Sequence, residues 1–451
     1  MSEDLDSPVG PGTVHRGESR RPRSRIPPLS DLVPRNRDFT IYWGSQSVSM
    51  VGDSFTLTTF PLLVLQTSGS VTQMGTMVAV GSIAMIVAGL FAGSIVDRTE
   101  PRMIIVSCDV VRGVLNLLIP LSWLSGPHIW LLYAVAVVGS AASVLFRVAH
   151  TKMITKLVDR AHFLAANGLS QAALGGAYVI GPATAGAIAG TLGLTAAIGL
   201  NGASFVLSAI GTLFIRTRAA RGAQAGDTAV GNHDVGGFLG GISFLRRHQV
   251  LRRLLVLQAI MAMLTYGLIN VFIYHLRHDL HQAYGTVGLM LSGAATGAVI
   301  AAVAASRLRR RLGFAACWSG SYLVAGLAIA GLGITTDITA MWVIAAGFAF
   351  GTTLGLVCTI SLQQEMTPRH LLGRTTSIFT TVELAFGAAG VIVLTRTVGS
   401  FGARPVAVVV GVALAAVAAA SLFAPVRNRE LSADMSDPPC LAGCAGCSRT
   451  S

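Results

Sequence analysis

The chain has 451 residues, of which 52% are hydrophobic and 12% are charged, and its formal net charge is +13. Soluble domains usually carry about 25% charged residues, so this composition excludes a soluble globular protein and indicates a protein of the lipid bilayer. It also excludes a membrane barrel, because barrel strands alternate over about 10 residues and are only half apolar.

Long apolar runs predict the transmembrane helices. A helix needs roughly 20 apolar residues to cross a hydrocarbon core about 30 Å thick. Runs of this length with few charges predict twelve spans, at residues 39–61, 73–96, 103–124, 128–149, 166–190, 193–215, 251–275, 285–306, 314–334, 338–361, 374–395 and 403–425. The predicted fold class is therefore an all-α integral membrane protein with two six-helix bundles.

The positions of the basic residues predict the topology. Lys and Arg gather in the N-terminal tail and in the connectors that follow helices 4, 6 and 8, whereas only Arg277, Arg396 and Arg404 fall on the opposite side. By the positive-inside rule, both termini are cytoplasmic and the protein is a multi-pass protein of the cell membrane. The net charge then reflects topology, and no nucleic-acid partner is expected.

Polar segments divide the chain. Residues 1–38 and 426–451 have little to bury and are expected to be disordered cytoplasmic tails. The Gly-rich linker at 216–249 contains a stretch that could form a short interfacial helix. The two bundles, at 39–215 and 250–425, then have 177 and 176 residues. Equal halves suggest a duplicated unit with the substrate site between the repeats, near the bilayer midplane.

Asp53 is a carboxylate near the middle of the first predicted span. Inserting a charged side chain at mid-bilayer costs about 2.5–3.5 kcal/mol of free energy, so we expect such a residue to have a structural or functional role. Gln46, Asp53 and Phe60 are spaced by seven and share one helical face. Asp53 either faces a central cavity and takes up a proton or a cationic substrate, or it bonds a neighbouring helix and orders the bundle. Both interpretations remain open at this level.

The connector between helices 2 and 3, "GSIVDRTEPR", gathers charges between two apolar runs. Gly93 allows close approach of the helices, and Arg98 and Arg102 hold the connector on the cytoplasmic side. In helix 3, Asp109 and Arg112 are three residues apart, near its cytoplasmic end, and can pair with each other or with the connector. We expect a structural or gating role for this pair.

Helix 5 contains the segment "GGAYVIGPATAG". Its small residues would let a neighbouring helix approach closely, and its proline removes one backbone hydrogen bond and predicts a bend. Generic packing of small residues is the alternative to any functional role. The residues concerned are Gly175, Gly176, Gly181, Pro182 and Gly186.

Polar and aromatic residues also mark helices 7 and 11. Helix 7 has a stripe that could line the cavity for a large, mostly apolar ligand, or could serve helix packing and an aromatic belt. Glu383 lies near the middle of helix 11, where desolvation disfavours its charged form and suits a proton carrier. The stripe consists of Gln258, Met263, Tyr266, Asn270 and Tyr274.

Two further patterns bear on cofactors and energy. Three cysteines near the C-terminus, Cys440, Cys444 and Cys447, have a spacing found in iron–sulfur proteins, but they lie on a short polar tail without a fourth ligand. We expect a reduced cytoplasmic tail, open to lipidation, with no metal and no cofactor. The sequence has no G-x-x-x-x-G-K-S/T loop, so an ion gradient rather than ATP is the expected energy source.

Together, these features resemble the major facilitator superfamily. The connector matches the superfamily signature at Gly93, Asp97, Arg98 and Arg102, but has Glu100 and Pro101 where a glycine and a basic residue are usual. The segments "CDVVRG", "AANGLSQ" and "QQEMTPRHLLGRTTSI" are similar to the drug:proton antiporter group that contains macrolide-efflux and enterobactin-exporter-like proteins. The basic residue that many proton antiporters carry within helix 4 is absent, since Arg147 comes only at its cytoplasmic end.

The resemblance implies a function. It implies a monomeric transporter, not an enzyme, that exports a moderately hydrophobic small molecule through the bilayer by proton antiport. As isolated charges within apolar spans, Asp53 and Glu383 are the candidate proton or substrate carboxylates. The resemblance also implies that Asp97 latches the bundles against the N-terminus of helix 11, and that the helix 5 segment is an exporter motif. The alternatives are export of a dedicated siderophore-like metabolite, uptake by a permease of the same fold, or a non-transporting membrane sensor.

Overall fold

The computed structural model describes residues 36–158, 162–215, 242–368 and 371–423, and helices run through most of them. Residues 1–35 of the predicted N-terminal tail, the C-terminal tail with its three-cysteine motif, and most of the central linker lie outside the described residues, whereas Arg37 and Asp38 of the predicted tail already belong to the first helix. A short helix at 242–247 occupies part of the segment for which an interfacial helix was predicted.

Six helices form the first bundle, and local signals set their ends. The Asn36 side chain accepts a hydrogen bond from the Phe39 amide at the start of the first helix, and Gly69, with φ 65°, ends it. Pro101 takes the first position of the third helix, where a missing N–H costs nothing. The helices are α2 (Arg37–Ser68), α3 (Val71–Arg98), α4 (Pro101–Trp123), α5 (Ile129–Leu157), α6 (Phe163–Leu192) and α7 (Leu194–Leu213).

The second bundle differs from the prediction at one place. Predicted helix 7 is divided into two α-helices and a π-helical turn. Predicted helices 8 and 9 follow one another directly, and a kink at Gly313, where the backbone is non-helical with φ 78°, separates them. The elements are α9 (Gln249–Thr265), α10 (Leu268–Tyr274), η2 (His275–Asp279), α11 (Tyr284–Leu332), α12 (Ile338–Met366), α13 (Leu372–Phe401) and α14 (Ala403–Phe423).

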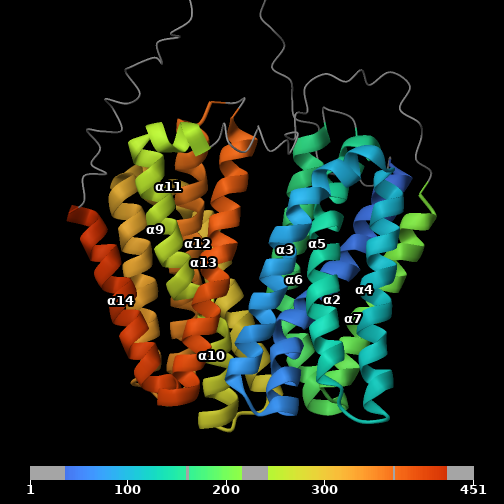
Figure 1. The fold of residues 1–451 in the computed structure, drawn as a ribbon, viewed down its shortest axis with the longest axis horizontal. Coiled ribbons are helices and arrows are strands. Elements are labelled where there is room, and N and C mark those ends of the chain that lie inside the picture. Colours follow the sequence, from blue (N-terminus) through green and yellow to red (C-terminus); the bar gives the residue numbers. More distant parts are fainter. Residues whose placement is uncertain (1–35, 159–161, 216–241, 369–370, 424–451) are drawn as a thin grey trace, which may run out of the picture.

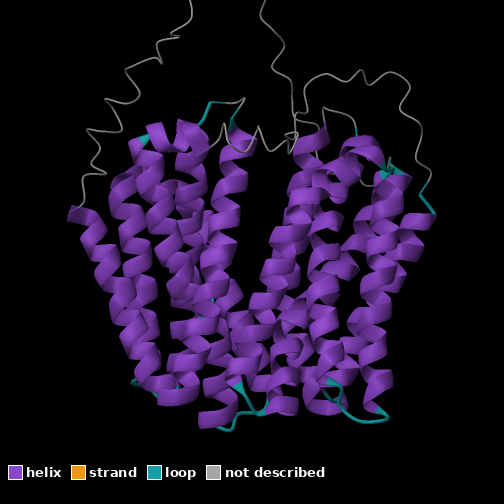
Figure 2. Ribbon diagram, viewed as in Figure 1, coloured by secondary structure: helices purple, strands orange, loops and turns teal. Residues whose placement is uncertain are grey.

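The predicted number of spans agrees with these helices. Eleven described helices are long and apolar enough to cross a membrane. One of them, α11, has 49 residues and supplies two crossings, on either side of Gly313. The described residues therefore contain twelve membrane-crossing segments. Figures 1 and 2 show that the helices form two bundles.

The two bundles meet at one end and separate at the other (Figure 2). Across the seam, α3 packs against α13 and α6 packs against α11. One hydrophobic cluster joins the bundles at the closed end, through residues such as Val71 and Val398. Toward the open end the core splits into two clusters, one around Met153 in the first bundle and one around Trp318 in the second. The open end is the one at which α2 begins, which is the predicted cytoplasmic side.

Candidate functional site

A cavity of about 360 Å³ lies between the bundles, near the middle of their helices. Its wall is mostly apolar, and a few polar groups converge on it, which is the usual composition of a small-molecule site. Most of the wall comes from the first bundle, whereas the second contributes Tyr266, Ile269 and Asn270. The apolar lining includes Leu57, Phe60, Met77, Met85 and Phe205, and the polar lining includes Asp53, Arg112, Asn116 and Asn270.

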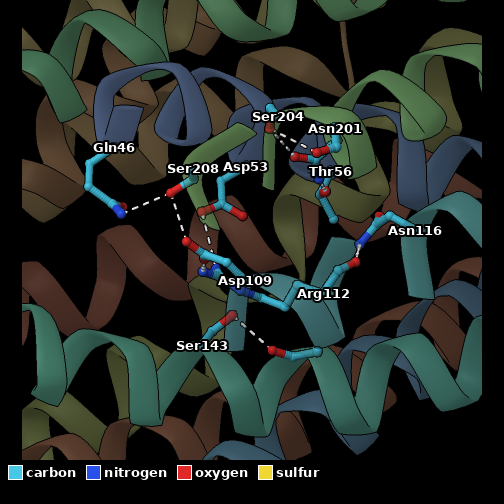
Figure 3. A network of polar contacts seen from close by, with 11 residues as sticks. Gln46, Asp53, Thr56, Asp109, Arg112, Asn116, Ser143, Asn201, Ser204 and Ser208 are labelled. Carbon is cyan, nitrogen blue, oxygen red and sulfur yellow. Dashed lines mark hydrogen bonds and ion pairs between the residues drawn. The ribbon is translucent and has the colours of Figure 1, made fainter. Parts of the chain in front are cut away.

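A chain of charged and polar side chains runs from this cavity into the first bundle (Figure 3). Arg112 on α4 donates to Asp53 on α2 at 3.4 Å, and to Asp109, one turn away, at 2.5 Å. The second oxygen of Asp109 accepts a hydrogen bond of 2.7 Å from Ser208 on α7. Ser208 in turn accepts one of 2.9 Å from Gln46. The network ties three helices of the bundle together.

Burial differs sharply along this chain. The side chains of Asp109 and Arg112 are 0% and 4% exposed, whereas that of Asp53 is 46% exposed and lines the cavity. The Arg112 guanidinium also lies 4.4 Å from the ring centre of Phe146 and 4.3 Å from that of Phe205. Two aromatic faces and two carboxylates therefore hold this cation in place.

The charges in this cluster do not balance. Asp53 and Asp109 carry two negative charges when both are ionised, and Arg112 supplies one positive charge. Because Asp109 is fully buried and accepts hydrogen bonds from Arg112 and Ser208, the excess negative charge is most accessible at Asp53. A proton or a cation at the cavity face of Asp53 would neutralise the cluster.

Comparison with known proteins identifies the family. The family model described as Major Facilitator Superfamily matches residues 42–391, which is more than half of the chain. The chain belongs to the Major Facilitator Superfamily. It is thus a multi-pass membrane transporter of a class that is not enzymatic.

The curated relatives of this superfamily member include efflux pumps. The "Multidrug efflux pump Tap" of Mycolicibacterium fortuitum is 23% identical over 397 residues, covering 86% of this chain and 95% of the relative. The protein of the same name from Mycobacterium tuberculosis is 24% identical over 353 residues, covering 76% of this chain and 83% of the relative.

Solved structures of the superfamily share the fold. The nucleoside transporter NupG superposes with a TM-score of 0.71 at 11% identity, covering 86% of this chain and 99% of that one. A bacterial homologue of the human lysosomal transporter Spinster, inward-facing and unoccupied, has a TM-score of 0.68 at 16% identity, covering 89% and 98%. At these identities the likeness concerns the fold alone.

A second cavity, of about 230 Å³, lies within the second bundle of this transporter. Its polar lining includes Glu383 on α13, Gln258 on α9 and the threonines Thr265, Thr352 and Thr353. Tyr266 lines this cavity and the central one. Three of the residues predicted to bind cargo or protons therefore meet in one place.

Not every predicted lining residue faces a cavity. Gln46 is 2% exposed and is buried between α2 and α7, because the face that carries Asp53 at mid-helix packs against α7 two turns earlier. Met263 is 37% exposed but lines neither of the two cavities, and its backbone carbonyl packs against Gly390. Tyr274 stacks on His278 at 4.6 Å, which fits its packing interpretation.

The position of Arg112 also corrects the prediction from the sequence. Arg112 lies at the midpoint of α4 and lines the central cavity, rather than lying near the cytoplasmic end of the helix. Asp109 and Arg112 pair with each other, as their spacing predicts. The partner that spacing could not reveal is Asp53, on another helix. The network residue Ser208 was also missed, although Asn201, Ser204 and Ser208 form a polar stripe at helical spacing in α7.

The connector at the predicted cytoplasmic side has its own contacts. Asp97 forms an ion pair with Lys152 of α5, within the same bundle and not across the seam. Arg102 donates to the carbonyls of Thr212 and Leu213 at 3.3 and 2.5 Å, which places a cation at the C-terminus of α7. Gly93 is half-buried and Arg98 is exposed.

The glycines of the helix 5 segment fall into two groups. A Cβ atom at Gly181 would lie 2.6 Å from Cβ of Ser54 on α2, and one at Gly186 would lie 2.9 Å from Cα of Gly288 on α11. Cβ atoms at Gly175 and Gly176 would meet nothing within 4 Å. Pro182 stands inside α6, which continues past it to Leu192. Close packing of α6 against its neighbours therefore requires glycine at positions 181 and 186, which lie toward the closed end, and not at positions 175 and 176.

Proposed function

We propose that this transporter exports moderately hydrophobic small molecules across the cell membrane in exchange for protons. The observation that carries the proposal is the uncompensated negative charge of the Asp53, Asp109 and Arg112 cluster at the wall of a mostly apolar cavity. The names of the curated relatives, which are multidrug efflux pumps, support the export direction.

In the proposed mechanism, Asp53 is the group that exchanges protons. A proton bound to Asp53 removes the excess charge, so the carboxyl group no longer requires the Arg112 guanidinium. Release of the proton restores the ion pair. Because the pair links α2 to α4 at the cavity wall, proton exchange changes the contacts that the cavity offers to cargo.

Asp109 is proposed to position Arg112 and not to carry the transported proton. It is fully buried, and its two oxygens accept hydrogen bonds from Arg112 and Ser208. A proton on Asp109 would disrupt contacts that hold three helices together. Asp53 has no such constraint on its cavity face.

The bundles are proposed to rock about the central cavity. The described arrangement is closed where α3 meets α13 and α6 meets α11, and it is open at the predicted cytoplasmic side. In the opposite state, Asp97 would leave Lys152 and meet the N-terminus of α13, as the family resemblance implies. Gly175 and Gly176, which meet nothing in the open state, would then allow the bundles to close over the cavity.

The experiment that tests this proposal is transport in an efflux-deficient bacterial host. Cells that express the chain should accumulate less of at least one compound from a panel of dyes and antibiotics, and a proton uncoupler should abolish the difference. Extrusion that is insensitive to the uncoupler would rule out proton coupling. Gradient-driven accumulation inside the cells would show uptake instead of export.

A pair of variants assigns the result to the cluster. Asp53→Asn should abolish uncoupler-sensitive extrusion, because the amide cannot exchange the proton. Glu365→Gln is the matched control, since it removes a carboxylate that is 58% exposed and pairs with Arg309 outside both cavities. Unchanged extrusion by Asp53→Asn would leave Asp53 with a packing role only.

A further inference from the structure

The cavity of the second bundle contains a carboxylate without a cation. Glu383 forms no ion pair with any described residue, in contrast to Asp53. Arg147 on α5 is exposed and forms no ion pair with Glu383. A carboxylate in a partly apolar cavity requires either a proton or a cation from outside the protein.

An unused hydrogen-bond acceptor lies beside this carboxylate. Gln258 is 4% exposed and lines the same cavity as Glu383. The Oε1 atom of Gln258 is buried and has no partner among the described residues. A buried acceptor without a donor is costly, so this oxygen suits a ligand that brings N–H groups.

Two aromatic rings complete the cavity, and glycines make room for them. A Cβ atom at Gly387 would lie 2.7 Å from Cγ of the Tyr266 ring, and one at Gly355 would lie 2.5 Å from the edge of the Tyr322 ring. Both rings line the cavity that contains Glu383. Aromatic faces near a carboxylate attract organic cations more strongly than neutral groups.

We propose that the Glu383, Gln258, Tyr266 and Tyr322 cavity is a subsite for the protonated amine of a cationic substrate. Glu383 balances the ammonium charge, the Gln258 Oε1 atom accepts one of its N–H groups, and the tyrosine rings contact its alkyl carbons. The bulk of the substrate extends past Tyr266 into the central cavity, since this ring borders both spaces. This inference rests on the proposed transport function and divides the work between the bundles, with protons at Asp53 and substrate charge at Glu383.

The test uses a matched pair of fluorescent probes and the purified full-length protein. Dansylcadaverine carries a primary ammonium group at pH 7, and its N-acetyl derivative is neutral with the same fluorophore. The wild-type protein should bind the cation about ten- to a hundredfold more tightly than the neutral probe, as expected for a charge-assisted contact. Glu383→Gln should reduce this preference to within about threefold.

Controls separate a lost subsite from a lost fold. Affinity for the neutral probe should stay unchanged in Glu383→Gln, which shows that the cavity is intact. Glu365→Gln, which removes an exposed carboxylate on α12, should keep the full preference for the cation. Gln258→Leu should lose part of the preference, by about three- to tenfold, because only one hydrogen bond is removed.

Two outcomes would overturn the subsite. Equal affinity of the wild-type protein for both probes would show that Glu383 does not recognise an ammonium group. A preference that survives in Glu383→Gln would place the recognition elsewhere. Neither outcome depends on transport. Insensitivity to the uncoupler would defeat the proposed proton exchange and leave the binding preference standing, so the two proposals can fail separately.

Discussion

The two bundles of this transporter treat their membrane-embedded acids differently. In the first, Arg112 neutralises part of the charge of two carboxylates and is enclosed by Phe146 and Phe205. In the second, Glu383 lines a cavity together with two tyrosine rings and the amide of Gln258, and it forms no ion pair with a described residue. Halves of the same architecture therefore place an acid that shares a fixed cation on one side of the substrate path and an acid without any fixed cation on the other.

This difference gives a physical reason for separate functions of Asp53 and Glu383. An acid beside a fixed guanidinium can release and regain a proton because the carboxylate that forms still has a positively charged partner. An acid without a fixed cation gains most from a cation that arrives with the cargo. Substitutions that remove either kind of compensation test the comparison directly.

The largest effect is expected from Arg112→Met. The change leaves Asp53 and Asp109 without a cation, and loss of one partner from a buried pair costs about 3–5 kcal/mol of folding free energy. Thermal unfolding of the purified variant should show this loss, and transport should fall below detection. Arg310→Met, at an exposed arginine on α11, is the matched control.

A second substitution separates charge from packing in this variant. Adding Asp109→Asn to Arg112→Met removes the fully buried charge and should recover more than half of the lost stability. An Arg112→Met protein as stable as the wild type would show that the first bundle does not depend on its charge network. That result would contradict the difference proposed between the acids of the two bundles.

The next prediction contrasts the two acids under an imposed pH gradient. In proteoliposomes, Asp53→Asn should lose gradient-driven transport by about tenfold or more, because one general acid–base group is removed. Glu383→Gln should still respond to the gradient, with a weaker affinity for cationic cargo. Asp53→Asn remains folded in this view, since Arg112 keeps its pair with Asp109. If the gradient response were lost only in Glu383→Gln, Glu383 and not Asp53 would be the group that exchanges protons.

The sequence predicted the membrane-crossing segments well, and the reason is physical. Apolar runs long enough to cross the bilayer are a property of local composition, so the twelve spans and two bundles could be recognised without tertiary information. Gly313 shows the limit of this reasoning. Its non-helical backbone makes a kink between two helices that follow one another without a loop, and hydropathy carries no signal for the direction of the chain at that point.

The candidate site was less predictable, because its geometry depends on contacts between helices. Asp53 and Glu383 stood out as isolated charges in apolar runs, and both line cavities. The pairing of Asp53 with Arg112 joins residues 59 positions apart and leaves no trace in helical spacing. Gln46 shows the converse, since a shared helical face did not bring it to the cavity.

A smaller effect is expected from Gly387→Ala in the second bundle. The added methyl group would meet the Tyr266 ring at 2.7 Å and push it toward the space it borders. Affinity for a cationic probe should fall by about three- to tenfold, which is the loss of a partly desolvated cation–π contact. Gly373→Ala on the same helix is the control, because nothing lies within 4 Å of its Cβ position. Equal binding by both variants would remove Tyr266 from the subsite.

The smallest effect on stability is expected from Asp97→Asn, outside the cavities. Its ion pair with Lys152 is partly exposed, and exposed pairs contribute about 0–1 kcal/mol to the free energy of unfolding. This is far less than the contribution expected from the buried pair of Asp109 and Arg112. The unfolding temperature should therefore hardly change. If Asp97 instead meets α13 when the open side closes, transport should drop severalfold in the same variant, because the charge serves only the state in which the bundles meet. A loss of transport without a loss of stability would locate the contribution of Asp97 in the conformational cycle, whereas unchanged transport would leave it as a surface ion pair of the first bundle.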